Sequence, residues 1–286
     1  MPATLRLNVA YDGSHFHGWQ RMPGVATIQE HLERALGTVL RVPVVVNAAG
    51  RTDAGVHACG QVCSVALAGP LDALALRRAL RGTNALLPDG IAVTALSHRP
   101  EGWHARFSAI GKRYVYRVFD APFPPVFTPT TRWHVPRRLD VESMQRAALC
   151  LVGDHDFEAF RAAGCQARHA RRYLWRACVT RHDDDVVVEL RGNAFVRSQV
   201  RVTVGTLVEV GLGKRPEADV RAILEGRDRT RAGRTAPPSG LFLDRVYYAE
   251  DAAEADIPPG ATWPGWPPDP GAPRRHAPPP DHDDDE

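Results

Sequence analysis

The sequence predicts an α+β protein made of two similar halves, each with the element order of a ferredoxin-like (RRM-like) unit. Hydrophobic periodicity over residues 1–105 gives the order β-α-β-β-α-β. A looser version of the same order returns over residues 106–248. The chain of 286 residues is long enough to bury a core as one large domain or as two small ones.

The first half contains the clearer pattern. LRLNVAY alternates as a strand, and Thr27 precedes an amphipathic run as a helix cap. The predicted elements are strands at 5–11, 42–47, 61–67 and 91–97, with helices at 28–40 and 72–80. This order is the split βαβ unit, an antiparallel sheet with helices on one face.

The second half repeats the theme with an insertion. Its predicted elements are strands at 114–119, 173–181, 186–191 and 241–248, with helices at 141–151 and 195–210. Four prolines between residues 122 and 129 would interrupt any regular element, so residues 121–136 are predicted to form a loop.

The C-terminal segment, residues 249–286, has a different composition. It contains ten prolines and ends in PPPDHDDDE. Such a segment buries too little apolar area to offset the entropy of ordering, which predicts a disordered acidic tail. Its last acids, with His276 and His282, could bind a metal weakly, but a solvated charge run is favoured.

The distribution of charge favours a polyanionic partner. The net charge is +3, but residues 250–286 hold ten acids and two arginines, which leaves +11 on the rest of the chain. Such an excess attracts nucleic acid. Of the 36 basic residues 34 are arginine, a bias that suits phosphate binding and that a GC-rich genome would also produce.

Cysteine usage and hydropathy indicate the compartment. Five cysteines, none in a CxxC pair, suggest neither a disulfide framework nor a zinc ribbon. No stretch approaches the roughly 20 apolar residues of a membrane span. We expect a cytoplasmic protein that does not contact a membrane.

The segment GRTDAGVHACGQV, Gly50–Val62, places ionisable residues between two apolar strands. It could be a hairpin connection in which the Asp53 carboxylate accepts from nearby backbone amides. Alternatively, Arg51 holds Asp53 ionised in a pocket, Gly55 lets the backbone approach a ligand, and His57 hydrogen-bonds nearby.

A second loop, YDGSHFHGWQR at 11–21, concentrates aromatic and basic side chains that could hold single-stranded nucleic acid. His15, His17 and His57 could instead bind a metal, but no cysteine or carboxylate stands at the usual zinc spacing. No metal site is predicted.

Five blocks occur in an order and spacing that resemble the TruA family of tRNA pseudouridine synthases: YDGSHFHGWQR, GRTDAGVHACGQV, WHARFSAIGKRYVYRV, NAFVRSQVRVTVGTLVEVG and TAPPSGLFL. The resemblance covers about Leu5–Tyr248. It implies that the two halves join into one extended antiparallel sheet with a basic cleft at the junction. It also implies a homodimer that isomerises uridine to pseudouridine at positions 38, 39 and 40 of the tRNA anticodon stem-loop, without metal or other cofactor.

The resemblance assigns roles residue by residue. Asp53 matches the catalytic aspartate, Arg51 the arginine that pairs with it, and Arg201 a basic residue that forms a salt bridge to it. Tyr114 matches the tyrosine that stacks on the target base, and Leu241 is expected to pack against that base. His57 and Arg21, from the two loops, are expected to contact the substrate. The helix departs from the family pattern, since many relatives have a histidine near Ser198 and a second basic residue after Arg201.

The reaction explains these residue types. The N1–C1′ bond must break, the detached uracil must turn, and C5 must join C1′. An ionised aspartate could add to C6, attack C1′ or remove the 2′ proton, and the sequence does not choose among these routes. Two other functions stay open: an RNA-binding protein or folding chaperone, and a hydrolase that uses Asp53 as a base.

Overall fold

The fold is taken from a computed structural model that describes residues 2–165 and 167–257. Most of the predicted acidic tail, with His276, His282 and the terminal aspartates, lies outside the described residues.

The first half forms the predicted split βαβ unit. Its elements are β1 (Ala3–Tyr11), α1 (Ile28–Leu40), β2 (Asn47–Ala48), β3 (His57–Leu67), α2 (Ala73–Leu86) and β4 (Ile91–Arg99). The strands lie in the order β4-β1-β3, with the short β2 paired to β3. Helix α1 packs against the apolar side chains of β1 through Ile28, Leu32 and Leu36. Because these residues are four positions apart, they lie on one face of the helix.

The second half repeats this arrangement. Its corresponding elements are β5 (Gly111–Phe119), α3 (Val141–Leu149), β8 (Arg171–His182), β9 (Asp185–Gly192), α4 (Gln199–Gly211) and β10 (Leu241–Tyr247). Their strands lie in the order β10-β5-β9-β8, the same relative order as in the first half. Further elements are β6 (Trp133–His134), β7 (Gly153–Asp156) and α5 (Ala218–Gly226).

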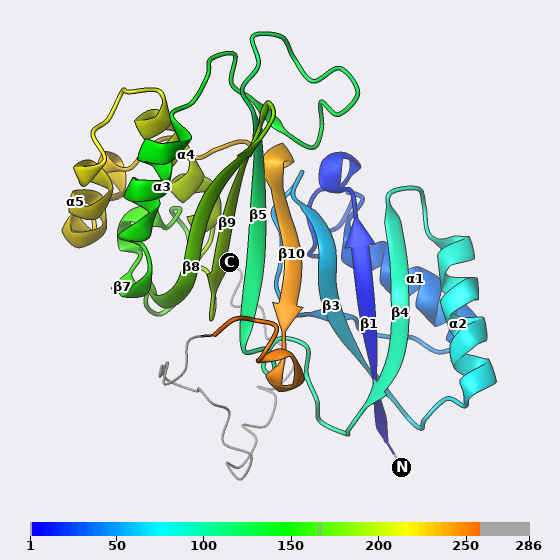
Figure 1. The fold of residues 1–286 in the computed structure, drawn as a ribbon. Helices are drawn as coiled ribbons and strands as arrows, with labels where there is room; N and C mark the ends of the chain where they lie inside the picture. The colour runs from blue at the N-terminus through cyan, green and yellow to red at the C-terminus, as the bar shows by residue number, and fades with distance from the viewer. Residues whose placement is uncertain (1, 166, 258–286) are drawn as a thin grey trace.

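A short parallel pairing joins the halves into one sheet. Phe242 and Leu243 of β10 pair with His57 and Ala58 of β3, which gives the strand order β4-β1-β3-β10-β5-β9-β8-β7. Figure 1 shows this sheet with α1 and α2 at one end and α3, α4 and α5 at the other. The predicted α+β class with one extended, mostly antiparallel sheet is confirmed.

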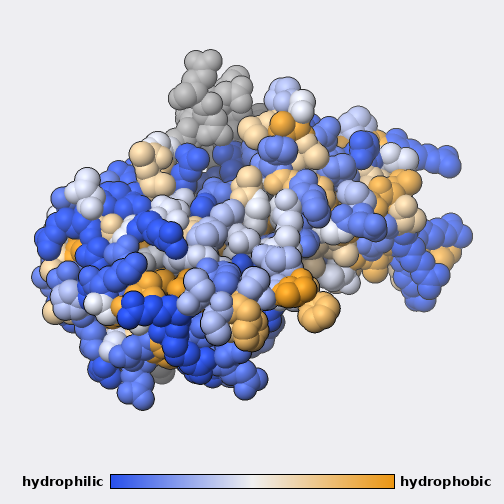
Figure 2. All heavy atoms as spheres, turned by 90° about the horizontal axis from the view of Figure 1, so that it is seen from above, coloured by the Kyte–Doolittle hydropathy of each residue, from blue (hydrophilic) through white to orange (hydrophobic). Residues whose placement is uncertain are grey.

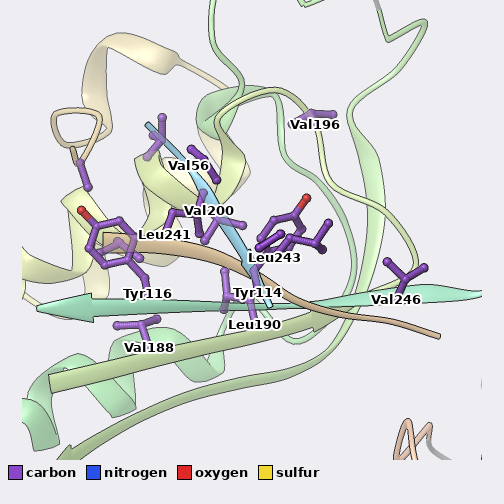
Figure 3. Packing of buried hydrophobic residues seen from close by; sticks show 14 of the residues in the cluster. Val56, Tyr114, Tyr116, Val188, Leu190, Val196, Val200, Leu241, Leu243 and Val246 are labelled. Atoms are coloured by element: carbon purple, nitrogen blue, oxygen red, sulfur yellow. The ribbon is translucent and has the colours of Figure 1, made fainter. Parts of the chain in front are cut away.

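The two faces of the sheet differ in chemistry. Along β9, Val186, Val188 and Leu190 are fully buried, whereas the alternating residues are only partly buried. Successive strand residues point to opposite faces, so the apolar set defines a helix-bearing face and the other set defines the opposite face. The side chains of Tyr114 and Tyr116, on β5, lie on the helix-bearing face (Figure 3).

The strand predicted at 42–47 is wrong, because only Asn47 and Ala48 form β2. Pro43 lacks an amide donor. In addition, β2 and β10 share one edge of β3, since β1 occupies the other edge. In the register of β2, residues 42–46 would have to pair with residues 65–69, but β3 ends at Leu67, whereas β10 pairs with the other end of β3.

Other boundaries also differ from the sequence prediction. The helix predicted from 195 begins at Gln199, because the Gln199 side chain accepts from the Val196 amide in a turn before the helix. The predicted loop 121–136 contains β6, and β7 and α5 were not predicted. Residues 249–257, assigned to the tail, form a turn that packs back on the sheet, where Trp175 donates to the Ala255 carbonyl.

On the side of the molecule seen from above Figure 1, hydrophobic residues form small separate patches among hydrophilic ones (Figure 2). Within the part of the chain that the structure describes, no helix has the length and apolarity needed to span a membrane.

Candidate active site

The loop that carries Asp53 is held by backbone and buried side-chain contacts. The Thr52 hydroxyl lies 2.8 Å from the Tyr11 hydroxyl, and the Thr52 carbonyl accepts from the Trp19 amide at 3.0 Å. Gly18, at φ +89°, packs so closely on the Thr52 carbonyl that a Cβ there would lie 2.8 Å from the oxygen. The loop at 11–21 therefore fixes the backbone on which Asp53 stands.

The Asp53 carboxylate is directed across the junction of the halves. Its Oδ2 accepts from Arg201 Nη1 at 3.1 Å and from the Ser198 hydroxyl at 3.4 Å. Ser198 precedes α4 and Arg201 lies in its first turn, where the helix dipole favours a negative charge. The segment around Asp53 forms a turn between strands. Its Asp53 carboxylate, however, accepts from side chains at the start of α4 in the other half.

Arg201 is itself fixed in place. Its Nε donates to the Ala236 carbonyl at 2.8 Å, which orients the guanidinium toward Asp53. The Arg201 side chain is 17% exposed and that of Asp53 is 38% exposed. The pair is thus shielded on the arginine side and open to a ligand on the carboxylate side.

Tyr114 lies on β5 close to this pair. Its ring packs edge-on against Phe195, with 4.9 Å between centroids, and it is 9% exposed. Burial first, and then the nearby Asp53 charge, raise the pKa of Tyr114 well above its ordinary value, so the phenol is neutral at physiological pH. Leu243 stands opposite Tyr114 in the sheet, and Leu241 lies two residues away on the same face (Figure 3).

The other predicted site residues, His57, Arg21 and Arg51, lie in or next to the loops at 11–21 and 50–62. His57 is 1% exposed; its Nδ1 faces the Gly13 amide at 3.1 Å, and its Nε2 faces the carbonyls of Thr130 and Ser239. It therefore joins three loops beneath the surface and presents no free edge to a substrate. Arg21 is exposed but forms a 3.0 Å ion pair with Glu33 on α1. Arg51 is exposed on the Asp53 loop, and its pairing with Asp53 stays a prediction.

Two residues near the site were not assigned from the sequence. The Ser198 hydroxyl donates to Asp53. Its position as a polar residue directly before an apolar helix is the sequence signal that could have identified it. Lys112 lies two residues before Tyr114 and packs against Gly50, at the start of the Asp53 loop. As for the metal alternative, the described residues contain no cluster of three or more His, Cys, Asp or Glu side chains that could hold an ion.

A carboxylate paired with an arginine beside a neutral aromatic ring offers a charged group and a stacking surface to a planar ligand. A family model described as tRNA pseudouridine synthase matches residues 8–108 and 147–249. The chain belongs to this family of tRNA pseudouridine synthases, isomerases that convert uridine in tRNA to pseudouridine.

Relatives extend the match over most of the chain. It is 43% identical over 253 residues to tRNA pseudouridine synthase A of Syntrophotalea carbinolica, which covers 88% of this chain and 99% of that protein. The proteins of the same name from Shigella boydii and Escherichia coli are each 43% identical over 86% of this chain and 90% of their own length.

Proposed function

We propose that this enzyme isomerises uridine at positions 38, 39 and 40 of the tRNA anticodon stem-loop, with Asp53 as its nucleophile. The 3.1 Å contact between Asp53 Oδ2 and Arg201 Nη1, beside Tyr114, carries the proposal. The arginine donates to the carboxylate and holds it in place, and the open side of the carboxylate leaves room for a flipped nucleotide. The positions in tRNA rest on the resemblance to the TruA family.

Each residue has a distinct task in this proposal. Asp53 initiates cleavage of the N1–C1′ bond. Tyr114 holds the detached uracil by stacking, which offsets stacking lost when the base flips out, an effect of ~1–3 kcal/mol per base. When C5 bonds to C1′, C5 loses its proton to solvent and N1 gains one, so the RNA mass does not change.

The same resemblance supports a homodimer that works in the cytoplasm and needs no added cofactor. Each half contributes to the site, Asp53 from the first and Tyr114 with Arg201 from the second. Sedimentation of the purified protein alone and with tRNA tests the dimer, and a monomer that is fully active would contradict it.

Tritium release tests the substrate assignment. Transcripts would carry [5-³H]uridine at 38, 39 or 40 only, with cytidine at the other two positions. Wild-type protein should release tritium from all three without added metal or cofactor, and not from a transcript labelled only in the acceptor stem. Release confined to other positions would contradict the proposal, and free uracil would indicate a hydrolase.

The binding-protein alternative predicts a different pattern. It predicts tRNA binding without tritium release by wild-type protein. An Asp53→Ala variant should bind tRNA under either interpretation, so loss of binding in a folded variant would contradict both.

A further inference from the structure

Lys112 places a cation beside the candidate active site. It stands two residues before Tyr114 on the regular strand β5, so both side chains lie on the helix-bearing face. Its Nζ lies 2.9 Å from where a Cβ on Gly50 would be, so the ammonium group rests against the backbone that leads to Asp53. Gly50 is thus a position where any side chain would displace this ammonium group.

No carboxylate balances this charge among the described residues. The charged groups that act on Lys112 are Arg106 and Arg172, both cations. Burial, followed by these two arginines, lowers the pKa of Lys112 to about 8. A half-buried cation without a partner destabilises a fold, which makes its presence informative.

Arg172 is a second partly buried cation near Lys112. Its Nη1 donates to the carbonyls of His169 and Arg171, and its Nε is buried without a hydrogen-bond partner. Burial lowers the pKa of this guanidinium also. Arg172 thus adds positive charge near Lys112 that no ion pair among the described residues offsets.

We propose that Lys112, together with Arg106 and Arg172, binds a backbone phosphate that flanks the uridine held on Tyr114. This inference rests on the proposed function. Two residues along a strand span about 6.5–7 Å, a length similar to that between a base and the phosphate of its own nucleotide. A phosphate supplies the negative charge that the site lacks and anchors the RNA while the uracil is detached.

The chain provides its own control for this proposal, because Lys214 is the only other lysine and is exposed. Lys112→Met keeps the apolar stem and removes the charge, Lys112→Arg keeps the charge, and Lys214→Met is the matched control. Lys112→Met should weaken tRNA binding roughly 3- to 10-fold and lower the slope of log K against log salt by about 0.7–0.9, the value of one phosphate contact.

A merely structural lysine would behave differently. Lys112→Met should bind tRNA more weakly and yet melt at the same temperature as wild type or higher, because the substitution removes an unbalanced charge. Lys112→Arg should restore binding and the salt slope, and Lys214→Met should leave both unchanged. A neutral methylphosphonate on either side of the target uridine should weaken wild type but add no further loss to Lys112→Met at the contacted position.

A footprint on wild-type protein covers the case of a variant that does not fold. Acylation near pH 8 should label Lys112 in free protein, and tRNA should protect Lys112 but not Lys214. An unchanged salt slope in folded Lys112→Met, or no protection by tRNA, would overturn the proposal. Absence of tritium release by wild type would instead remove the proposed function, while slopes and footprint would still decide whether Lys112 contacts phosphate.

Discussion

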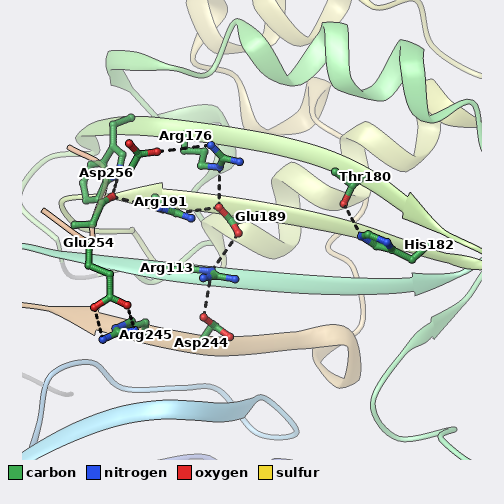
Figure 4. A network of polar contacts seen from close by, with 12 residues as sticks. Arg113, Arg176, Thr180, His182, Glu189, Arg191, Asp244, Arg245, Glu254 and Asp256 are labelled. Carbon is green, nitrogen blue, oxygen red and sulfur yellow. Dashed lines mark hydrogen bonds and ion pairs between the residues drawn. The ribbon is translucent and has the colours of Figure 1, made fainter. Parts of the chain in front are cut away.

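The two faces of the sheet use basic residues in opposite ways. On the opposite face, Glu189 forms ion pairs with Arg113, Arg176 and Arg191 at 2.8–3.1 Å, and Asp244 also forms an ion pair with Arg113 (Figure 4). On the helix-bearing face, Lys112 and Arg172 have no such carboxylate among the described residues.

The difference shows which charges serve the fold and which are available to a substrate. An arginine surrounded by carboxylates stabilises the protein and offers little to RNA. A cation left unbalanced weakens the protein and becomes useful when an anion arrives. Arg201 lies between these cases, since its partner Asp53 is itself the proposed nucleophile.

Removing the charge of Arg201, on the helix-bearing face, should lower catalysis more than removing the charge of an arginine on the opposite face. Arg201→Met should lower kcat about 100-fold or more, because Asp53 loses the donor that orients it. Arg191→Met on the opposite face is the matched control and should keep kcat within about twofold of wild type. Single-turnover tritium release measures both, and equal losses would show that the two faces do not differ as described.

Two variants of Tyr114 distinguish stacking by its ring from a role of its hydroxyl. Tyr114→Leu should lower kcat/KM roughly 5- to 150-fold, which corresponds to ~1–3 kcal/mol of lost stacking. Tyr114→Phe keeps the ring, so activity close to wild type is expected. If Tyr114→Phe loses as much activity as Tyr114→Leu in the same assay, the hydroxyl rather than the ring carries the role.

Glu189 should matter for stability and little for catalysis. Glu189→Gln leaves three arginines short of a charged acceptor and should destabilise the protein by ~1–3 kcal/mol. Thermal unfolding followed by circular dichroism measures this change, and tritium release should stay within about twofold of wild type. A stable but inactive variant would place the opposite face in the reaction.

The last prediction concerns pH. The pKa of Lys112 is lowered from 10.5 to about 8, so the unfolded state binds more protons than the folded state between these values. The stabilities of wild type and Lys112→Met should therefore converge as pH rises from about 8 to 10.5, since the unfavourable charge is lost. Urea titrations at several pH values measure this, and a difference that does not change with pH would contradict the shift.

The sequence predicted what depends on local pattern. Helix α1 was placed at its observed bounds because its apolar spacing is a local signal, although the side chain of the predicted cap Thr27 makes no capping hydrogen bond. Asp53 was singled out because a polar loop between apolar strands is unusual, and its catalytic role was implied by the resemblance to the TruA family. The pairing of β10 with β3 could not be predicted from pattern, because it joins residues about 185 positions apart that belong to different halves.

The role suggested for Lys112 also depends on the fold. In the sequence it is one basic residue among 36. Its lack of a carboxylate becomes visible only when β5, the Asp53 loop and Arg172 come together. His57 shows the converse, because its position in the Asp53 loop suggested a substrate contact whereas the fold buries both ring edges.

The central claim is that Asp53 initiates isomerisation of uridine in tRNA, and Asp53→Asn tests it most directly. Tritium release from [5-³H]uridine-labelled tRNA and tRNA binding would be measured side by side for wild type and the variant. We expect rapid release by wild type, at least about 1000-fold slower release by Asp53→Asn, and similar binding by both. Comparable release by a folded Asp53→Asn variant would show that Asp53 is not the nucleophile and only shapes its loop.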